Sequence, residues 1–221
     1  MNFSRKAFLF DLNGTMIDDM EFHAKAWHLI LNNELGATLS YEEVKSHMYG
    51  KNSELLVRIF GEARFTDEEI TTLSVEKEKG YQKEYFPHLK LIDGLDIFLE
   101  KAKGHEIPMA IGSAAIPYNI DFVVDNLNIR HYLSAIVSAD DVKNSKPDPE
   151  TFLKAAELLG VDPSNCIVFE DAPKGVESAQ NARMKCVVLT TMHEEHEFSQ
   201  YNNILFFVKD YTESEKLESL F

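Results

Sequence analysis

Six short apolar segments, separated by helical patterns, constrain the fold of this chain more than any other feature. Each is four or five residues long, is rich in β-branched or aromatic side chains, and is apolar at consecutive rather than alternate positions. Continuous apolar character is typical of strands that are covered on both faces. The predicted strands are Ala7 to Phe10, Pro108 to Gly112, Ala135 to Ser138, Ile167 to Glu170, Cys186 to Leu189 and Ile204 to Val208.

Helical patterns lie between most of these segments. The predicted helices are Leu95 to Lys103, Tyr118 to Leu127, Glu150 to Leu159 and Gly175 to Ala182. Strands that alternate with helices form a parallel sheet with helices on both faces, because each parallel connection must return to the same end of the sheet. The sequence therefore predicts an α/β fold with a Rossmann-like parallel sheet as its core.

One long stretch interrupts this alternation. Residues 19–90 contain no segment typical of a strand and show amphipathic helix patterns, with capping-box spacing at Ser40 and Thr66. We predict an α/β core domain of residues 1–18 and 91–221, and a helical, four-helix cap domain of residues 19–90 inserted after the first strand. The end of the chain, after the last strand, is expected to be a frayed acidic tail.

Charge and composition narrow the classes of partner. The 221 residues include 22 basic and 37 acidic side chains, a formal net charge of −15, and 44% are hydrophobic. These proportions indicate a globular protein, and so acidic a chain disfavours nucleic acid and anionic membranes as partners. No apolar run approaches the roughly 20 residues that a bilayer requires. The N-terminus has no signal-peptide pattern, and Cys166 and Cys186 lie in apolar runs. We expect both cysteines to be core residues in a reducing, cytoplasmic compartment.

Polar residues follow the carboxyl ends of four predicted strands. They are Asp11-Leu12-Asn13-Gly14-Thr15, Ser113, Lys146-Pro147 and Glu170-Asp171. Residues at the carboxyl ends of parallel strands converge on one edge of the sheet, where ligands bind in folds of this class. Clustered carboxylates repel one another and need a cation, and hard oxygen ligands suit Mg²⁺. The sequence therefore predicts a magnesium site next to a lysine, a hydroxyl and an amide.

These motifs, in this order, resemble the four signature motifs of the haloacid dehalogenase superfamily. The resemblance rests on Phe10 to Thr15, Ser113, Lys146-Pro147, and Glu170-Asp171 followed by Gly175, and it extends along the whole chain. The insertion after the first motif, with Glu21-Phe22-His23 and Ala26-Trp27, is similar to the cap of the β-phosphoglucomutase-like phosphatases. The resemblance implies Mg²⁺-dependent transfer of a phosphoryl group from a small phosphorylated metabolite to water.

The resemblance also implies a role for each motif residue. Asp11 would attack phosphorus and form an aspartyl-phosphate, which splits one difficult displacement into two easier ones. Ser113 and Lys146 would bind the transferring phosphoryl oxygens. The implied Mg²⁺ ligands are Asp11, the main-chain carbonyl of Asn13, Glu170 and Asp171, directly or through water.

Position 13 departs from the family's pattern. Most phosphatases and mutases of the family have an aspartate two residues after the nucleophile, where it protonates the leaving oxygen and activates water, whereas this chain has Asn13. An amide cannot exchange a proton at neutral pH, and loss of a general acid/base typically costs about 10² to 10⁴ in rate. Hydrolysis of sugar phosphates is therefore disfavoured more than hydrolysis of acyl phosphates or pyrophosphate, whose leaving groups depart more readily.

The sequence is compatible with three origins of Asn13. Asn13 could belong to a slow or leaving-group-selective enzyme, to a protein that has lost catalysis and only binds its ligand, or to an engineered Asp→Asn trap. We favour the first, because every other motif residue is present. The predicted function is accordingly a phosphatase of the haloacid dehalogenase type. The alternatives are a sugar phosphomutase and a phosphometabolite-binding protein with negligible turnover.

Substrate selection is expected in the cap, which closes over the site in this family. The candidate substrate-binding residues are His23, Gly50, Lys51, Ser113 and Ala114. Compared with the mutase pattern, Tyr49 replaces a lysine and Ser53 replaces the arginine that grips a second phosphate, with Lys51 as a candidate substitute. These departures argue against a phosphoglucomutase.

Other residues of the cap receive a structural role or none. The hinge carries Asp18 and Asp19 where the family has a threonine, and we assign these carboxylates no role. Phe22, Trp27 and Leu31 are expected to form the apolar stripe of the first cap helix. The histidines other than His23 show no metal-binding spacing and are expected at the surface. A monomer is expected, because the cap must move.

Overall fold

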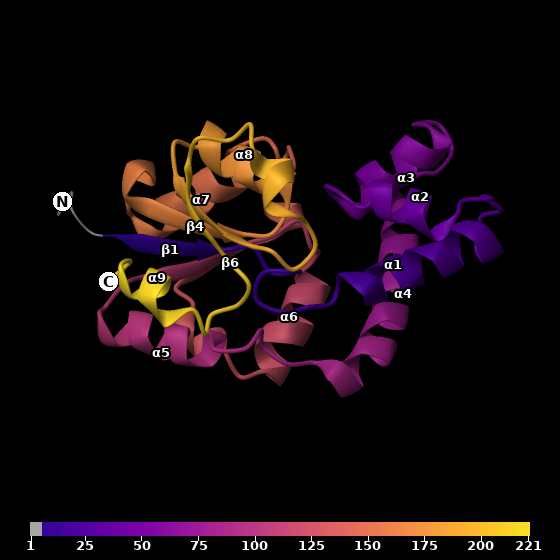
Figure 1. Cartoon of the computed structure of the whole chain (residues 1–221). Helices are drawn as coiled ribbons and strands as arrows, with labels where there is room; N and C mark the ends of the chain where they lie inside the picture. Colours follow the sequence, from indigo (N-terminus) through magenta and orange to yellow (C-terminus); the bar gives the residue numbers. More distant parts are fainter. Residues whose placement is uncertain (1–5) are drawn as a thin grey trace.

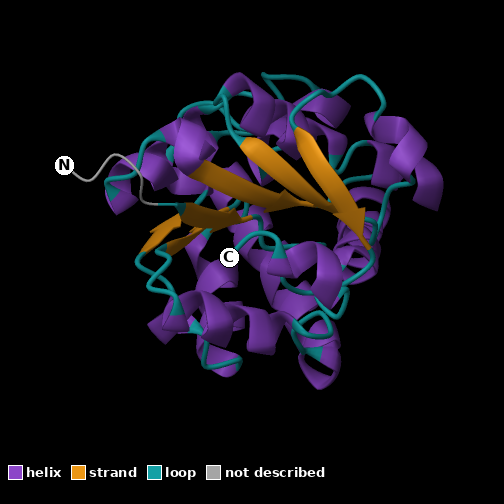
Figure 2. Ribbon diagram, turned by 60° about the vertical axis from the view of Figure 1, so that its left-hand side comes forward, coloured by secondary structure: helices purple, strands orange, loops and turns teal. Residues whose placement is uncertain are grey.

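The predicted α/β fold is confirmed in the computed structural model, which describes residues 6–221. Six parallel strands form one sheet in the order β3-β2-β1-β4-β5-β6, with helices on both faces (Figures 1 and 2). The strands are β1 (Ala7–Phe10), β2 (Met109–Gly112), β3 (Ala135–Val137), β4 (Cys166–Glu170), β5 (Lys185–Leu189) and β6 (Ile204–Val208). The central strand β1 therefore brings its carboxyl end between those of β2 and β4.

Two apolar cores lie on opposite faces of the sheet. Side chains alternate across a strand, so Phe8 and Phe10 of β1 pack into one core and Leu9 into the other. The first core is covered by α5 (Leu95–Gly104), α6 (Pro117–Asn126) and α9 (Ser214–Glu218), and the second by α7 (Glu150–Leu159) and α8 (Pro173–Asn181) (Figure 1). Because both faces are covered, the strands are apolar throughout.

Short 3₁₀ helices complete the connections between these elements. They are Phe86–His88, Arg130–Tyr132, Ala139–Asp141, Pro163–Asn165 and Glu195–Phe198. Cys166 and Cys186 are buried free thiols, as predicted. Within residues 6–221, no helix is both long enough and apolar enough to span a bilayer.

The end of the chain differs from the prediction of a frayed tail. After β6 the chain forms α9, and Leu217 and Leu220 are buried against the sheet. The ring of Phe221 lies 5.8 Å from that of Phe8 and 5.3 Å from that of Phe98. The prediction gave weight to the acidic side chains, whereas burial of these apolar side chains fixes the segment on the core.

A helical insert separates β1 from β2 and lies beyond the carboxyl ends of the strands (Figure 1). It contains α1 (Met20–Leu29), the π-helical turn Ile30–Glu34, α2 (Tyr41–Ser46), α3 (Asn52–Phe60) and α4 (Asp67–Tyr85). The capping boxes predicted at Ser40 and Thr66 are both present, at the starts of α2 and α4. The insertion of a helical cap after the first strand is thus confirmed, while the division at residues 18/19 and 90/91 stays a prediction.

The insert has an apolar cluster of its own. Trp27 and Leu31 belong to it, as predicted for the stripe of the first cap helix. Phe22 does not, because it packs against the core that contains Phe8, and its ring lies 5.0 Å from that of Tyr85. Phe22 therefore packs against the end of α4, at the border between the insert and the core, and not in the insert's own apolar cluster.

Candidate active site

Asp11 lies at the carboxyl end of β1, in contact with a buried lysine. Its Oδ1 accepts a hydrogen bond from Lys146 Nζ at 2.5 Å, and the same ammonium donates to Glu170 Oε1 at 2.8 Å. The three side chains are buried, each residue 8% exposed or less. Lys146 thus joins the predicted nucleophile, which follows β1, to an acidic residue at the end of β4.

Glu170 uses both carboxylate oxygens within the protein. Its Oε2 accepts hydrogen bonds from the main-chain nitrogens of Asp171 and Ala172 at 2.9 and 2.8 Å. Gly175 makes room for this conformation, because a Cβ at that position would lie 1.7 Å from Glu170 Oε1. Glu170 is therefore suited to hold a metal ion through water rather than directly.

Asp171 packs against the loop that follows β1. Its Oδ1 accepts a hydrogen bond from Thr15 Oγ1 at 3.2 Å. Gly14 has a φ of +79°, and a Cβ there would lie 2.1 Å from Asp171 Oδ2. Only glycine combines this left-handed backbone with so close an approach, which explains its place directly after Asn13.

The site holds more negative charge than its lysine balances. Burial raises the pKa of Asp11 to about 7, with Lys146 opposing the rise and Glu170 adding to it. Burial, then repulsion from Glu170 and Asp11, raises the pKa of Asp171 well above its ordinary value. Burial would lower the pKa of Lys146, but Asp11 and Glu170 outweigh burial and raise it. Such a group of carboxylates favours a bound cation.

The donor set fits a Mg²⁺ ion that keeps several water ligands. Within residues 6–221, no three His, Cys, Asp or Glu side chains are arranged to hold a metal ion by themselves. Mg²⁺ is usually bound by one or two carboxylates, with waters and substrate phosphate completing its shell. The carboxylates of Asp11 and Asp171 and the main-chain carbonyl of Asn13 can supply the protein ligands, with Glu170 acting through water.

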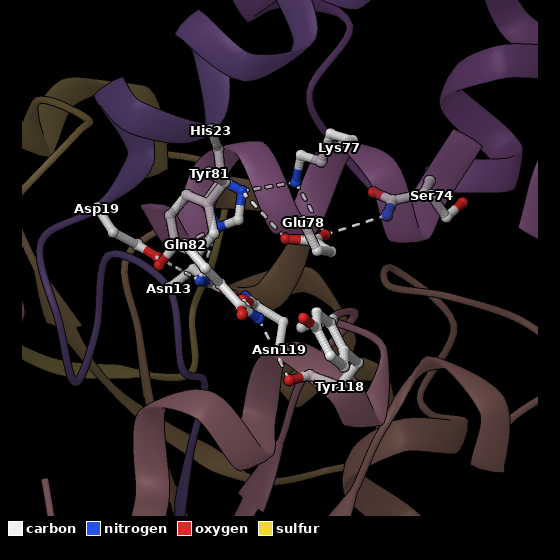
Figure 3. Close-up of polar contacts among 12 residues, drawn as sticks. Asn13, Asp19, His23, Ser74, Lys77, Glu78, Tyr81, Gln82, Tyr118 and Asn119 are labelled. Carbon is white, nitrogen blue, oxygen red and sulfur yellow. Dashed lines mark hydrogen bonds and ion pairs between the residues drawn. The ribbon is translucent and has the colours of Figure 1, made fainter. Parts of the chain in front are cut away.

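Asn13 contacts a buried carboxylate at the start of the insert (Figure 3). Its Nδ2 donates to Asp19 Oδ2 at 2.6 Å and lies 3.0 Å from His23 Nε2. Asp19 is 1% exposed, and its Oδ2 also accepts a hydrogen bond from Tyr81 at 2.5 Å and lies 3.1 Å from His23 Nε2. Asp18 is exposed. Of the two hinge carboxylates, Asp19 therefore directly contacts Asn13.

Helix α4 adds a buried charged pair that sequence reasoning missed. Lys77 Nζ lies 2.6 Å from His23 Nδ1 and donates to Glu78 Oε1 at 2.9 Å (Figure 3). Asn52 Nδ2 donates to the same Glu78 oxygen at 3.1 Å. Burial would raise the pKa of Glu78, but Lys77, His23 and the hydrogen bonds outweigh burial and lower it. The pair lies on the buried face of α4 with Tyr81, so the helical spacing of these residues was the available signal.

A pocket of about 160 Å³ lies between the core and the insert. Every predicted site residue lines it: Asp11, Asn13, His23, Gly50, Lys51, Ser113, Ala114, Lys146, Glu170 and Asp171. Lys77 and Glu78 line it too. The structure therefore brings together residues from four strand ends and from the insert, and none of the other histidines, all of which lie within residues 6–221, is buried.

The ammonium of Lys51, a predicted substrate-binding residue, contacts main-chain carbonyls of the core. Its Nζ donates to the main-chain carbonyl of Val142 at 2.5 Å and lies 3.4 Å from that of Lys143. Beside it, Ser145 Oγ donates to Glu54 at 2.5 Å. Because carbonyls of the core engage its ammonium, Lys51 joins the insert to the core in this structure.

Comparisons with known proteins agree with the fold. A family model for haloacid dehalogenase-like hydrolases matches residues 8–189. The chain is 39% identical to an uncharacterized protein of Haemophilus influenzae, over 80% of this chain and 86% of that protein. It is 31% identical to fructose-1-phosphate phosphatase of Escherichia coli, over 81% of this chain and 93% of that protein. The structure of β-phosphoglucomutase from Clostridium difficile superposes on this chain with a TM-score of 0.81. The two sequences are 27% identical, and the superposition covers 97% of this chain and 98% of the other.

Proposed function

This chain belongs to the haloacid dehalogenase-like hydrolases, and we propose that it is a phosphatase that hydrolyses a small phosphorylated metabolite through Asp11. The observation that carries the proposal is the Asp11–Lys146–Glu170 contact, buried at the end of the central strand and open to the pocket that Ser113 also lines. A carboxylate held beside an ammonium in such a pocket can attack an electrophilic phosphorus while the lysine binds the phosphoryl oxygens.

The proposed reaction has two steps. An oxygen of Asp11 forms a bond to phosphorus as the bond to the substrate's leaving oxygen breaks, which gives an aspartyl-phosphate and a leaving group whose oxygen takes a proton from solvent. Water then attacks the same phosphorus and loses a proton to solvent as the bond between phosphorus and Asp11 breaks, which releases inorganic phosphate and restores the Asp11 carboxylate. Lys146 and Ser113 hold the phosphoryl oxygens in both steps. When bound by Asp11, Asp171 and the carbonyl of Asn13, Mg²⁺ supplies positive charge for the phosphoryl group.

Asn13 limits which substrates this reaction can use quickly. Its amide can orient a leaving oxygen or a water but cannot give or take the proton. We therefore propose slow turnover, or selectivity for leaving groups that depart without an acid. A phosphometabolite-binding protein with negligible turnover is the second candidate, and Asn13 is the observation that favours it.

Phosphate release separates these two functions. With Mg²⁺ and p-nitrophenyl phosphate, we expect the wild-type chain to turn over and to yield an Asp11-phosphorylated peptide after an acid quench. Asp11→Asn should do neither, while Asp18→Asn, a change of an exposed carboxylate, should behave as wild type. Equal phosphate release by the wild-type and Asp11→Asn chains would contradict the mechanism, and absence of release from both would favour the binding protein.

A further inference from the structure

One carboxylate oxygen in the wall of the pocket has no partner. Glu78 is 2% exposed and lines the pocket, and within the described residues its Oε2 is buried without a hydrogen bond. Its other oxygen accepts a hydrogen bond from Lys77 at 2.9 Å (Figure 3). The same oxygen accepts one from Asn52 at 3.1 Å. The side chain is therefore fixed in place with one strong acceptor left over.

No neighbouring donor in the described chain accounts for this oxygen. The ring of His23 approaches it, but the Nδ1 atom lies 3.9 Å away, beyond hydrogen-bond range, and is itself 2.6 Å from Lys77 Nζ. A buried charged acceptor without a donor is costly, so it calls for a specific cause. Glu78 also lies on the insert, whereas the residues that would hold the phosphoryl group lie on the core. A donor on a bound ligand would satisfy it.

We propose that Glu78 Oε2 accepts a hydrogen bond from a substrate hydroxyl, so that the substrate is a phosphate monoester of a polyol or sugar whose hydroxylated carbon chain lies against the insert. This inference rests on the proposed function, which places the phosphate at Asp11 and Lys146. A neutral donor suits the position, because the Lys77 ammonium at 2.9 Å already balances the carboxylate's charge.

The rest of the pocket wall fits such a chain. Trp27, Met48 and Leu55 line the pocket from the insert and offer apolar contact to the carbon skeleton. A second phosphate or a carboxylate at this end would approach the Glu78 carboxylate, which disfavours bisphosphates. Ser53, which stands where the mutase pattern has its phosphate-gripping arginine, agrees with that exclusion.

Matched pairs of ligands test the assignment. We would measure calorimetric binding, in Mg²⁺, of glycerol, ribitol and sorbitol phosphates and of propyl, pentyl and hexyl phosphates, which have the same chain lengths without hydroxyls. The wild-type chain should prefer at least one hydroxylated ligand over its alkyl partner by about tenfold or more. Glu78→Gln keeps a carbonyl for Lys77 and Asn52 but replaces the free oxygen by NH₂, and it should lose most of this preference.

Two further variants serve as controls for Glu78→Gln. Glu76→Gln makes the same chemical change at an exposed position of α4 and should keep the wild-type preference. Glu78→Asp keeps the charge but draws the carboxylate back from the pocket, so it should also lose the preference. This variant replaces Glu78→Gln in the test if Glu78→Gln does not fold. No preference in the wild-type chain, or full preference in a folded Glu78 variant, would overturn the assignment.

Phosphate release from the same ligands tests the proposed function separately. Preferential binding without release from any of these ligands or from p-nitrophenyl phosphate would uphold the role of Glu78 and contradict the phosphatase. Release from hydroxylated and alkyl phosphates at equal efficiency would uphold the phosphatase and contradict the role of Glu78.

Discussion

Restoring an aspartate at position 13 should create a conflict with Asp19 rather than a normal active site. Asn13→Asp replaces an N–H donor by a carboxylate oxygen 2.6 Å from Asp19 Oδ2, in a buried position. The lost hydrogen bond to a charged acceptor is worth about 1.5–3 kcal/mol. Two full charges at this separation would repel by about 6 kcal/mol at an effective dielectric constant of about 20. The folded variant should therefore bind one proton between the two carboxylates.

The proton that the folded variant keeps determines how its free energy of unfolding changes with pH. Above about pH 4 the unfolded chain ionises both carboxyls, whereas the folded variant keeps one proton, so its stability falls as pH rises. The slope is about 1.4 kcal/mol per pH unit for one proton. Relative to wild type, the free energy of unfolding of Asn13→Asp should thus be lowered by about 2.7 kcal/mol more at about pH 8 than at about pH 6.

The double variant Asn13→Asp, Asp19→Asn is the matched control. It keeps one carboxylate and one amide at the same contact, so we expect stability within about 1 kcal/mol of wild type and no added pH slope. Urea unfolding of the wild-type, single-variant and double-variant chains at several pH values, in EDTA, measures this. If the single variant Asn13→Asp is as stable as wild type at about pH 8, the inference of two crowded carboxylates is wrong. The full rise in turnover, about 10² to 10⁴, should appear in the double variant with a sugar phosphate, whose leaving oxygen needs a proton, and the rise should be smaller with p-nitrophenyl phosphate.

Three further predictions concern the metal, a glycine and the chain end. Because burial raises the pKa of Asp11 to about 7 and raises that of Asp171 well above its ordinary value, ionising these carboxyls costs stability as pH rises. At about pH 8, Mg²⁺ at a hundredfold excess over its Kd should therefore stabilise the chain by about 2.7 kcal/mol, and the same Mg²⁺ concentration should stabilise it less at about pH 5.5. Equal shifts in melting temperature at the two pH values would contradict this. Gly175→Ala, whose Cβ would meet Glu170, should cost about 1–3 kcal/mol in urea unfolding and most of the phosphatase activity. Gly80→Ala, which meets nothing within 4 Å, should cost neither. Phe221→Ala should cost about 3 kcal/mol in urea unfolding, whereas a frayed tail would show no loss.

Local pattern was enough to predict the sheet and most of the site. The strands are apolar on both faces, as β1 shows with Phe8 and Leu9 in different cores. The motif residues follow strand ends, and parallel strands bring those ends together, so their convergence in one pocket follows from topology.

The remaining site residues depend on contacts between distant parts of the chain. His23 meets Lys77 across 54 positions of sequence, and Tyr81 meets Asp19 across 62. Neither contact has a local signature, because it arises from how α4 packs on α1. The same holds for Lys51, whose main-chain acceptor Val142 is 91 positions away.

The contact between Asn13 and Asp19 bears on why this chain lacks the usual acid/base. An engineered Asp→Asn trap, or recent loss of a single carboxylate, implies an ancestor with aspartates at both positions. Such an ancestor would have placed two carboxylates about 2.6 Å apart in a buried site, and Asp19 is 1% exposed. The resemblance implies an aspartate at position 13 and a threonine at the hinge, where this chain has Asn13 and Asp18-Asp19, so an amide at position 13 would accompany a carboxylate at position 19. An exchange of this kind keeps the local charge constant, which a simple loss does not. We therefore propose that Asn13 serves as the hydrogen-bond donor of the buried Asp19 carboxylate, in a site that is rearranged and not disabled.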